Sequence, residues 1–347
     1  MWPWRLPASR ARVALALQGG GAHGAFTWGV LDALLEHTSQ PIVAASGASA
    51  GAMNAVVLTH GLLNGGRDGA RAALAAFWQA LGRAVPWDAM KLLSGDGDTL
   101  SPIARWMMRL TQRLSPTHAN PLRIDPLRDL LARSVDFERL ARQRTVSLHI
   151  AATHANTGRL RVFGNAELSL DVLMASACLP NLQPAVMIDG EPYWDGGFSA
   201  NPPLLPLLEV PGIDDLMIVM LSPWRLGTTP HSVDEIRARM IEIAFNATFL
   251  REMHWIAQAS LPRLPWRRGA LERRVQRTRW HLIDGNDHLS TLPSDSKLIA
   301  HQPLLERLRD AGRARTIAWL SSHGRAIGRC SSADLQRLFD GHEAPTG

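Results

Sequence analysis

The sequence predicts an α/β protein in which helices wrap a mainly parallel sheet. An apolar run at 13–17 is followed by a helix-compatible stretch over 22–37, and a second apolar run at 42–45 is followed by another over 50–60. Strands and helices that alternate in this order form parallel sheets, because each helix carries the chain back across one face of the sheet. The composition agrees, since 347 residues that are 46% apolar and 20% charged can bury a large core.

Strand-like runs continue to about residue 225. Four are expected, at 146–152, 160–163, 186–194 and 216–221. The third is interrupted by Pro192 and by Asp189-Gly190, a dipeptide that is typical of a hairpin turn. A helix is expected over 171–178, and Pro180 ends it. These elements place one core domain at residues 11–225.

Two regions of the chain are expected to be mainly helical. Residues 61–144 contain no obvious strand-like run and predict a helical insertion, which could form a lid over a site. Within it, an apolar face at 103–114 runs beside a stripe of arginines, and this face either packs on the core or contacts lipid. Amphipathic stretches at 231–258 and 301–322 predict a mainly helical C-terminal extension over 226–347.

The chain is basic, with a net charge of +6 at pH 7 that comes almost entirely from arginine. Such a surface attracts lipid headgroups, nucleic acid or acidic metabolites, or it is merely solvated. The segment 262–280 has seven arginines against one acid and contains Trp266 and Trp280, a composition suited to an anionic membrane surface or to a solvated linker. An anionic membrane surface is therefore a candidate partner, and no nucleic acid is expected.

Nothing in the sequence requires an oxidising compartment or a membrane span. The two cysteines, Cys178 and Cys330, form neither a disulfide framework nor a metal-ligand pattern. The apolar run at 13–17 is too short for the core of a signal peptide. The uncharged stretch at 42–63 is rich in Gly, Ala and Ser, which favours a buried strand, turn and helix. We expect a cytoplasmic protein that can associate peripherally with a membrane.

A glycine-rich loop, Gly19-Gly20-Gly21-Ala22-His23-Gly24, follows the first apolar run. Its Gly-x-Gly-x-x-Gly spacing between strand and helix fits a dinucleotide-binding loop, whose glycines let the backbone approach a pyrophosphate. The same backbone N–H groups can instead stabilise the oxyanion of an acyl-transfer intermediate. A dinucleotide site also needs an acidic residue at the end of the second strand, about 20 residues further on.

The second strand ends without such an acid. The chain there reads Gly47-Ala48-Ser49-Ala50-Gly51, a Gly-x-Ser-x-Gly turn that exposes a serine hydroxyl and makes Ser49 the candidate nucleophile. Packing by small residues is the alternative explanation of this turn. Neighbouring parallel strands end at one edge of the sheet, so we expect the glycine loop to lie beside Ser49 and to form its oxyanion hole. A nucleotide-dependent oxidoreductase stays open as the alternative function of the loop.

A serine nucleophile needs a base, and Asp195 is the candidate. It follows an apolar strand and precedes Gly196-Gly197, so the chain can turn sharply and leave the carboxylate at the strand end. An aspartate that only caps its own turn is the alternative. No histidine is indicated as a base, although His281 and His288 are nearest to the order of an α/β-hydrolase. Because an ordinary aspartate pKa is about 3.9, burial must raise the pKa of Asp195 for it to act as a base.

Together, the three motifs resemble those of the patatin-like phospholipase family, which occur in this order. The similarity covers about residues 11–225 and includes MASACLPNLQP at 174–184 and NPP at 201–203. The C-terminal helices, with the sequence IEIAFNATFLREM, resemble an extension of some bacterial members.

The resemblance implies a three-layer α/β/α catalytic domain and a serine acyl hydrolase of the lipase or phospholipase A type. It also implies a Ser-Asp dyad without histidine, in which Asp195 takes the proton of Ser49 and later activates water. No cofactor and no metal are expected. Many members carry Arg or Lys where this chain has His23, so the loop is expected to hold less fixed positive charge. A catalytically idle membrane-binding protein is a further alternative, and the intact Ser49 and Asp195 count against it.

Overall fold

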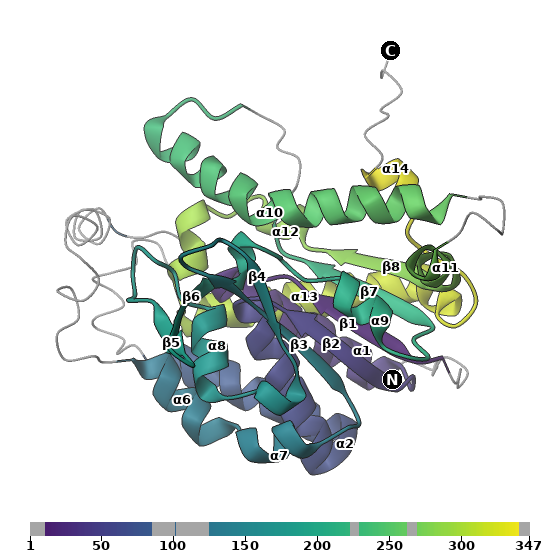
Figure 1. Ribbon diagram of the computed structural model, residues 1–347, viewed down its shortest axis with the longest axis horizontal. Helices are drawn as coiled ribbons and strands as arrows, with labels where there is room; N and C mark the ends of the chain where they lie inside the picture. The colour runs from purple at the N-terminus through teal and green to yellow at the C-terminus, as the bar shows by residue number, and fades with distance from the viewer. Residues whose placement is uncertain (1–10, 85–100, 102–124, 223–228, 262–268, 340–347) are drawn as a thin grey trace.

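The computed structural model describes residues 11–84, 101, 125–222, 229–261 and 269–339. Figure 1 shows a central sheet with helices on both sides. In the described chain this sheet has eight strands, which are β1 (Val13–Leu17), β2 (Ile42–Gly47), β3 (Ser147–His154), β4 (Leu160–Phe163), β5 (Val186–Ile188), β6 (Glu191–Asp195), β7 (Asp215–Met220) and β8 (Arg279–Asp284).

The strand order is β5-β6-β3-β2-β1-β7-β8, and β4 also pairs with β3. The five strands from β3 to β8 in this order are parallel to their neighbours. The remaining strands, β4, β5 and β6, are antiparallel to their partners. This mainly parallel sheet between helical layers confirms the predicted fold class.

Helices cover each face of the sheet over a separate hydrophobic core. The larger core lies under α1 (Gly24–His37), α2 (Ala50–Arg83), α6 (Pro126–Ser134), α7 (Phe137–Arg142), α8 (Leu170–Ser176), α12 (Asn286–Leu289) and α13 (Gln302–His323). The second core lies under α9 (Leu205–Glu209), α10 (Val233–Ser260), α11 (Ala270–Arg277) and α14 (Leu335–Phe339). Strand β1 contributes to both cores, because successive side chains of a strand point to opposite faces. Leu15 and Leu17 join the larger core, whereas Ala14 and Ala16 join the second.

The first helices match the expected boundaries, except that α2 is much longer than the predicted stretch over 50–60. It continues to Arg83 with non-helical backbone at Gly65 and Gly66, where two helices meet at a kink. The described parts of the expected insertion at 61–144 are mainly helical. Its apolar face at 103–114 lies outside the described residues.

The predicted turn at Asp189-Gly190 joins β5 to β6. Ile188 pairs with Glu191, and both turn residues have positive φ, 52° at Asp189 and 83° at Gly190. This conformation matches the twist of the two strands and is the one that Asp-Gly favours. The apolar run at 186–194 is therefore a hairpin.

The region after residue 225 contributes to the sheet as well as supplying helices. Strand β8 pairs with β7 and buries Trp280, although its residues belong to the arginine-rich segment 262–280. Trp280 is therefore not available to a membrane, and residues 262–268 lie outside the described chain. Helix α13 packs closely on α1, where a Cβ at Gly312 would overlap the carbonyl oxygen of Phe26. Among the described helices, none has the combination of length and apolar character that crossing a bilayer needs.

Candidate active site

The glycine loop and the Ser49 turn lie against each other at the carboxyl ends of β1 and β2. Leu17 pairs with Gly47 where these parallel strands end. A Cβ at Gly19 would lie 2.5 Å from the carbonyl oxygen of Ala48 and 2.9 Å from the Cβ of Ser49. A side chain at Gly19 would therefore push the two motifs apart. The structure brings together the two motifs that the sequence analysis expected to share one edge.

Small residues in the turn let the backbone pass closely on every side. A Cβ at Gly51 would overlap the carbonyl group of Leu17, and one at Gly47 would overlap the backbone of Gly51. Gly24 at the start of α1 faces Ala50 in the same way, since an added Cβ would lie 2.6 Å from the Cβ of Ala50. The small residues on both sides of Ser49 thus allow three backbone segments to pack closely around it.

Ser49 has an unusual backbone conformation at the start of α2. Its φ of 52° and ψ of −126° lie outside the regions that residues with a side chain prefer. Its N–H group lies 3.0 Å from both the carbonyl oxygen and the hydroxyl oxygen of Ser176, which stabilises the turn. Such strained residues cluster at functional sites, because the surrounding structure must hold them. Ser176 was part of a motif in the sequence analysis, but no role was expected for it.

Asp195 ends β6, and the side chain of Ser49 interacts with its carboxyl group. Its Oδ1 also accepts a hydrogen bond of 2.7 Å from the N–H of Gly197, so the residue caps its own turn and contacts the serine at once. The Asp195 residue is only 1% exposed. This burial raises the pKa of its carboxyl group from the ordinary 3.8 to about 7, although the hydrogen bonds from Gly197 and Ser49 favour the charged form.

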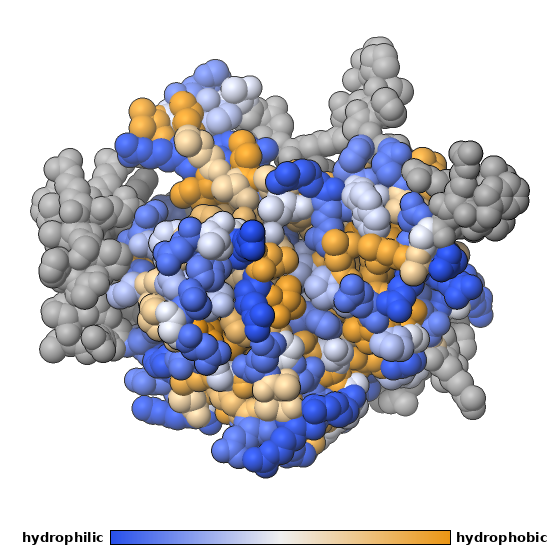
Figure 2. Space-filling model, in the orientation of Figure 1, coloured by the Kyte–Doolittle hydropathy of each residue, from blue (hydrophilic) through white to orange (hydrophobic). Residues whose placement is uncertain are grey.

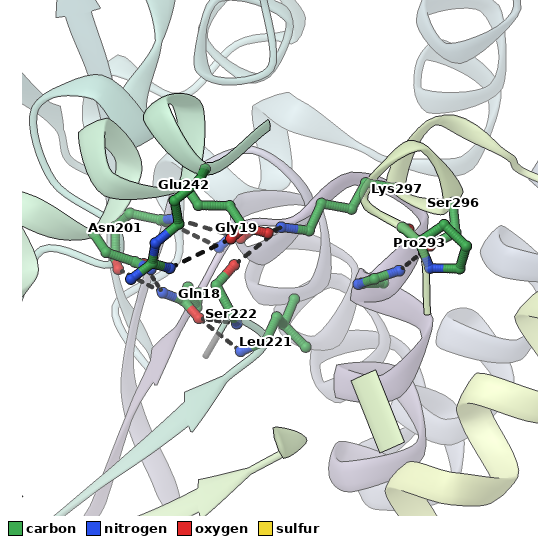
Figure 3. Close-up of polar contacts among 12 residues, drawn as sticks. Gln18, Gly19, Asn201, Leu221, Ser222, Glu242, Pro293, Ser296 and Lys297 are labelled. Carbon is green, nitrogen blue, oxygen red and sulfur yellow. Dashed lines mark hydrogen bonds and ion pairs between the residues drawn. The ribbon is translucent and has the colours of Figure 1, made fainter. Parts of the chain in front are cut away.

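Gln18 and Asn201 hold the glycine loop in place, and the sequence analysis expected neither to do so. Asn201 accepts a hydrogen bond of 2.7 Å from the N–H of Gly19 through its Oδ1. Gln18 accepts hydrogen bonds of 2.6 Å and 2.9 Å from the N–H groups of Leu221 and Ser222 (Figure 3). The only sequence signal was the NPP motif that contains Asn201.

The N–H groups at the start of the loop are available as donors. Within the described chain, the backbone N–H groups of Gly20 and Gly21 have no hydrogen-bond acceptor. Gly21 has a φ of 58°, and an added Cβ there would overlap the carbonyl oxygen of Lys297. The loop conformation therefore requires glycine at this position, and it leaves two adjacent N–H groups free to bind an anion.

His23 is a neutral side chain in this loop. It is buried, and burial together with the neighbouring Lys297 lowers the pKa of its imidazole to about 3. Its Nε2 lies 2.7 Å from the hydroxyl oxygen of Ser296, which itself donates to the carbonyl oxygen of Pro293 (Figure 3). Because the serine has only one hydroxyl proton, Nε2 of His23 must be the protonated ring nitrogen.

Lys297 places a positive charge beside the neutral His23. Its Nζ lies 3.3 Å from Oε1 of Glu242 and 3.4 Å from the hydroxyl oxygen of Ser222, as Figure 3 shows. Lys297 comes from the 3₁₀ turn η5 (Ser294–Leu298), far from the loop in sequence. A cavity of about 380 Å³ opens here, and its lining includes His23, Leu221, Glu242 and Lys297. Another segment thus places a lysine, ion-paired with Glu242, beside residue 23.

Helix α10 covers the Asp195 turn. A Cβ at Gly197 would overlap the ring of Phe245, and that ring packs on Phe198 with 4.6 Å between centroids. One residue further along α10, the side chain of Asn246 accepts a hydrogen bond of 3.0 Å from Gln18. The helix therefore contacts the turn that follows the candidate base and the residue that precedes the glycine loop.

Another serine, histidine and aspartate are linked by hydrogen bonds elsewhere in the molecule. His281 on β8 lies 2.9 Å from Asp215 through Nε2 and 2.9 Å from the hydroxyl oxygen of Ser332 through Nδ1. Asp215 pairs with Val13, the first residue of β1. It therefore lies at the amino ends of the parallel strands, whereas the glycine loop follows the carboxyl end of β1. Arg279 also pairs with Asp215. Burial raises the pKa of the Asp215 carboxyl group, but the hydrogen bonds from His281 and Arg279 outweigh it and hold the pKa below its usual value. His281 therefore serves a structural cluster and contacts no residue of the Ser49 site.

A comparison with protein families agrees with the motifs. Residues 15–208 match the family model described as patatin-like phospholipase. Among solved structures, VipD from Legionella pneumophila is 16% identical with a TM-score of 0.38, and the match covers 91% of this chain and 67% of VipD. The type III effector protein ExoU is 16% identical with a TM-score of 0.29, and the match covers 90% of this chain and 54% of ExoU.

A structure of the ExoU–SpcU complex from Pseudomonas aeruginosa gives similar values, with 16% identity, a TM-score of 0.29, and coverage of 88% of this chain and 52% of that chain. The chain thus spans about half the length of the ExoU chains in these two structures. No curated protein matches the sequence. The family match covers more than half of the 347 residues. The chain therefore belongs to the patatin-like phospholipase family of lipid ester hydrolases.

Proposed function

We propose that this protein cleaves lipid acyl esters through a dyad of Ser49 and Asp195, with the glycine loop as its oxyanion hole. The observation that carries the proposal is the buried carboxyl group of Asp195, whose pKa is raised to about 7 and whose charged form is favoured by the side chain of Ser49. An aspartate with an ordinary pKa is too weak a base at neutral pH, whereas a base works best when its pKa lies near the working pH. Burial supplies that adjustment here.

In the first step, the hydroxyl oxygen of Ser49 attacks the acyl carbonyl carbon while Asp195 accepts the hydroxyl proton. The carbonyl oxygen becomes an oxyanion, and the proposal assigns the N–H groups of Gly20 and Gly21 to stabilise it. Collapse of the tetrahedral intermediate expels the alcohol, which takes the proton from Asp195, and leaves an acyl-Ser49 enzyme. In the second step, Asp195 removes a proton from water, and the oxygen of that water attacks the acyl carbon. Collapse of the second tetrahedral intermediate breaks the bond to the Ser49 oxygen, which takes the proton back from Asp195, and the fatty acid leaves.

In this proposal, the residues that form the oxyanion hole carry no formal charge. His23 is neutral near pH 7, since burial and Lys297 lower the pKa of its imidazole to about 3. Stabilisation of the oxyanion therefore rests on backbone dipoles, which are already oriented and need no rearrangement during the reaction. Gln18 and Asn201 support this arrangement by holding Gly19 and its neighbours.

A test compares wild type with Ser49→Ala and Asp195→Asn in hydrolysis of p-nitrophenyl butyrate and in labelling by a fluorophosphonate probe. Wild type should turn over and be labelled, Ser49→Ala should do neither, and Asp195→Asn should lose turnover by at least about a hundredfold. Asp189→Asn, an exposed aspartate in the β5–β6 turn, is the matched control and should behave as wild type. Equal rates for all four proteins would disprove the proposed dyad.

A further inference from the structure

The first half of α10 exposes an unusual number of large apolar side chains. Met240 is 65% exposed, Val233 64% and Ile243 52%, and the full set is Val233, Ile236, Met240, Ile241 and Ile243. Figure 1 shows the beginning of α10 projecting from the body of the molecule, and Figure 2 shows hydrophobic side chains on that projection. We call these five residues the α10 apolar face.

Helical geometry places the five side chains together on the solvent side. With 3.6 residues per turn, they fall within an arc of about 160° around the helix axis. The opposite side of the helix carries Phe245, Asn246 and Phe249, which contact the protein body. A surface helix normally turns its apolar stripe toward the core, so an outward apolar arc indicates that something else covers it.

The charges near the α10 apolar face are suited to an anionic surface. Arg237 and Arg251 are exposed and fall within the same arc, by the same geometry. Two acidic side chains in this part of the helix form other polar interactions. Glu242 pairs with Lys297, and Glu235 accepts the N–H groups at the start of the helix. A helix with apolar residues and arginines on one side is typical of segments that lie in the headgroup region of a bilayer.

The same helix leads directly to the candidate site. Ile243 on the apolar face is followed two residues later by Phe245, whose ring packs over Gly197 beside Asp195. Two residues of helix span about 3 Å along the axis. A surface that covers the apolar face would therefore lie across the width of α10, about 10–12 Å, from the ring that packs over the Asp195 turn.

We propose that the α10 apolar face binds an anionic lipid bilayer and holds the active site at that interface. This inference rests on the proposed function, since it names the physical form of the substrate that the site receives. The apolar side chains enter the acyl boundary and the arginines bind headgroup phosphates. The Ser49 site then meets its lipid at the membrane, without extraction of a monomer into water.

The test measures sedimentation of the full chain with vesicles of phosphatidylcholine and phosphatidylglycerol at a 3:1 ratio. All proteins carry Ser49→Ala, which prevents hydrolysis of the vesicles during the measurement. The double substitution Ile236→Asp and Met240→Asp should raise the lipid concentration for half-maximal binding by at least about tenfold. Met187→Asp, which replaces another exposed methionine, 57% exposed on β5, is the matched control and should bind as the parent does.

A second measurement separates membrane binding from folding and from catalysis. With Ser49 intact, the double variant should hydrolyse soluble p-nitrophenyl butyrate at the parent rate but lose activity on the vesicles. The milder pair Ile236→Ser and Met240→Ser replaces it if the aspartates lower the helix content measured by circular dichroism. If wild type fails to cleave the soluble ester, the proposed dyad is wrong, while vesicle binding still tests the α10 apolar face.

Two results would overturn the inference. The first is equal vesicle binding by the parent and by the double variant. The second is a change in sedimentation coefficient without a change in vesicle binding, which would assign the α10 apolar face to a second copy of the chain.

Discussion

Replacing Asp195 by Asn should stabilise the folded protein at pH 8 while removing the proposed base. The amide keeps an oxygen that can accept the N–H of Gly197, as Oδ1 does at 2.7 Å in the wild type. It removes the charge that burial makes costly. The substitution therefore tests the cause of the raised pKa of Asp195 separately from its role in catalysis.

The size of the effect follows from the change in pKa between the unfolded and folded chain. Burial raises the pKa of Asp195 from 3.8 to about 7, so between these values the folded protein holds a proton that the unfolded chain releases. Stability contributed by the protonated group therefore falls as pH rises from about 4 to about 7 and is constant above. Three pKa units correspond to about 4 kcal/mol at pH 8, and the penalty is below about 1 kcal/mol at pH 4.

The assay is urea unfolding of wild type and Asp195→Asn at several pH values between 4 and 8. Groups that the two proteins share cancel in the difference between their unfolding free energies. That difference should grow by roughly 3 kcal/mol in favour of the variant over this range. The exposed Asp189→Asn should show a difference that does not change with pH. A pH-independent difference for Asp195→Asn would refute the argument that burial raises the pKa of this carboxyl group.

Three further results are expected. The kcat/KM of wild type on a neutral soluble ester should rise with pH and level off above an apparent pKa near 7, because Asp195 must be ionised to act as a base. A flat pH profile of kcat/KM from pH 5 to 8 would contradict this expectation. Asn201→Ala removes the acceptor for the N–H of Gly19 and should lower kcat about tenfold with little change in KM, whereas an unchanged kcat would mean that the loop needs no such support. Gly312→Ala should cost about 2–4 kcal/mol in urea unfolding, because its Cβ would overlap a backbone oxygen of α1. Gly65→Ala is its control, since the added Cβ meets no atom within 4 Å, and equal losses for both would refute the packing argument.

The motifs around Ser49 and Asp195 could be recognised in the sequence because their backbones pass too close for larger side chains. Gly19, Gly51 and Gly196 each face a neighbouring backbone at overlapping distance, and such constraints leave glycines at regular spacing. The residues that support the motifs leave no such trace. Gln18 and Lys297 act through single side chains whose partners lie far away in the chain.

The sequence by itself determined the α/β class, most of the strands and the three site motifs. These features depend on residues that are neighbours in the chain, so apolar runs, helical periodicity and turn residues reveal them. The segment 279–284 was not recognised as a strand, because its arginine and histidine break the apolar run, and the partner that they share, Asp215, lies far away in the chain on β7.

Only the tertiary structure decided the electrostatics of the site. The pKa of Asp195 and that of His23 depend on burial by elements that include helices from both ends of the chain. Lys297 brings its charge to the glycine loop through the packing of η5, and α10 covers the Asp195 turn through Phe245. Desolvation and charge interactions act over distances in space, and the order of residues in the chain does not specify those distances.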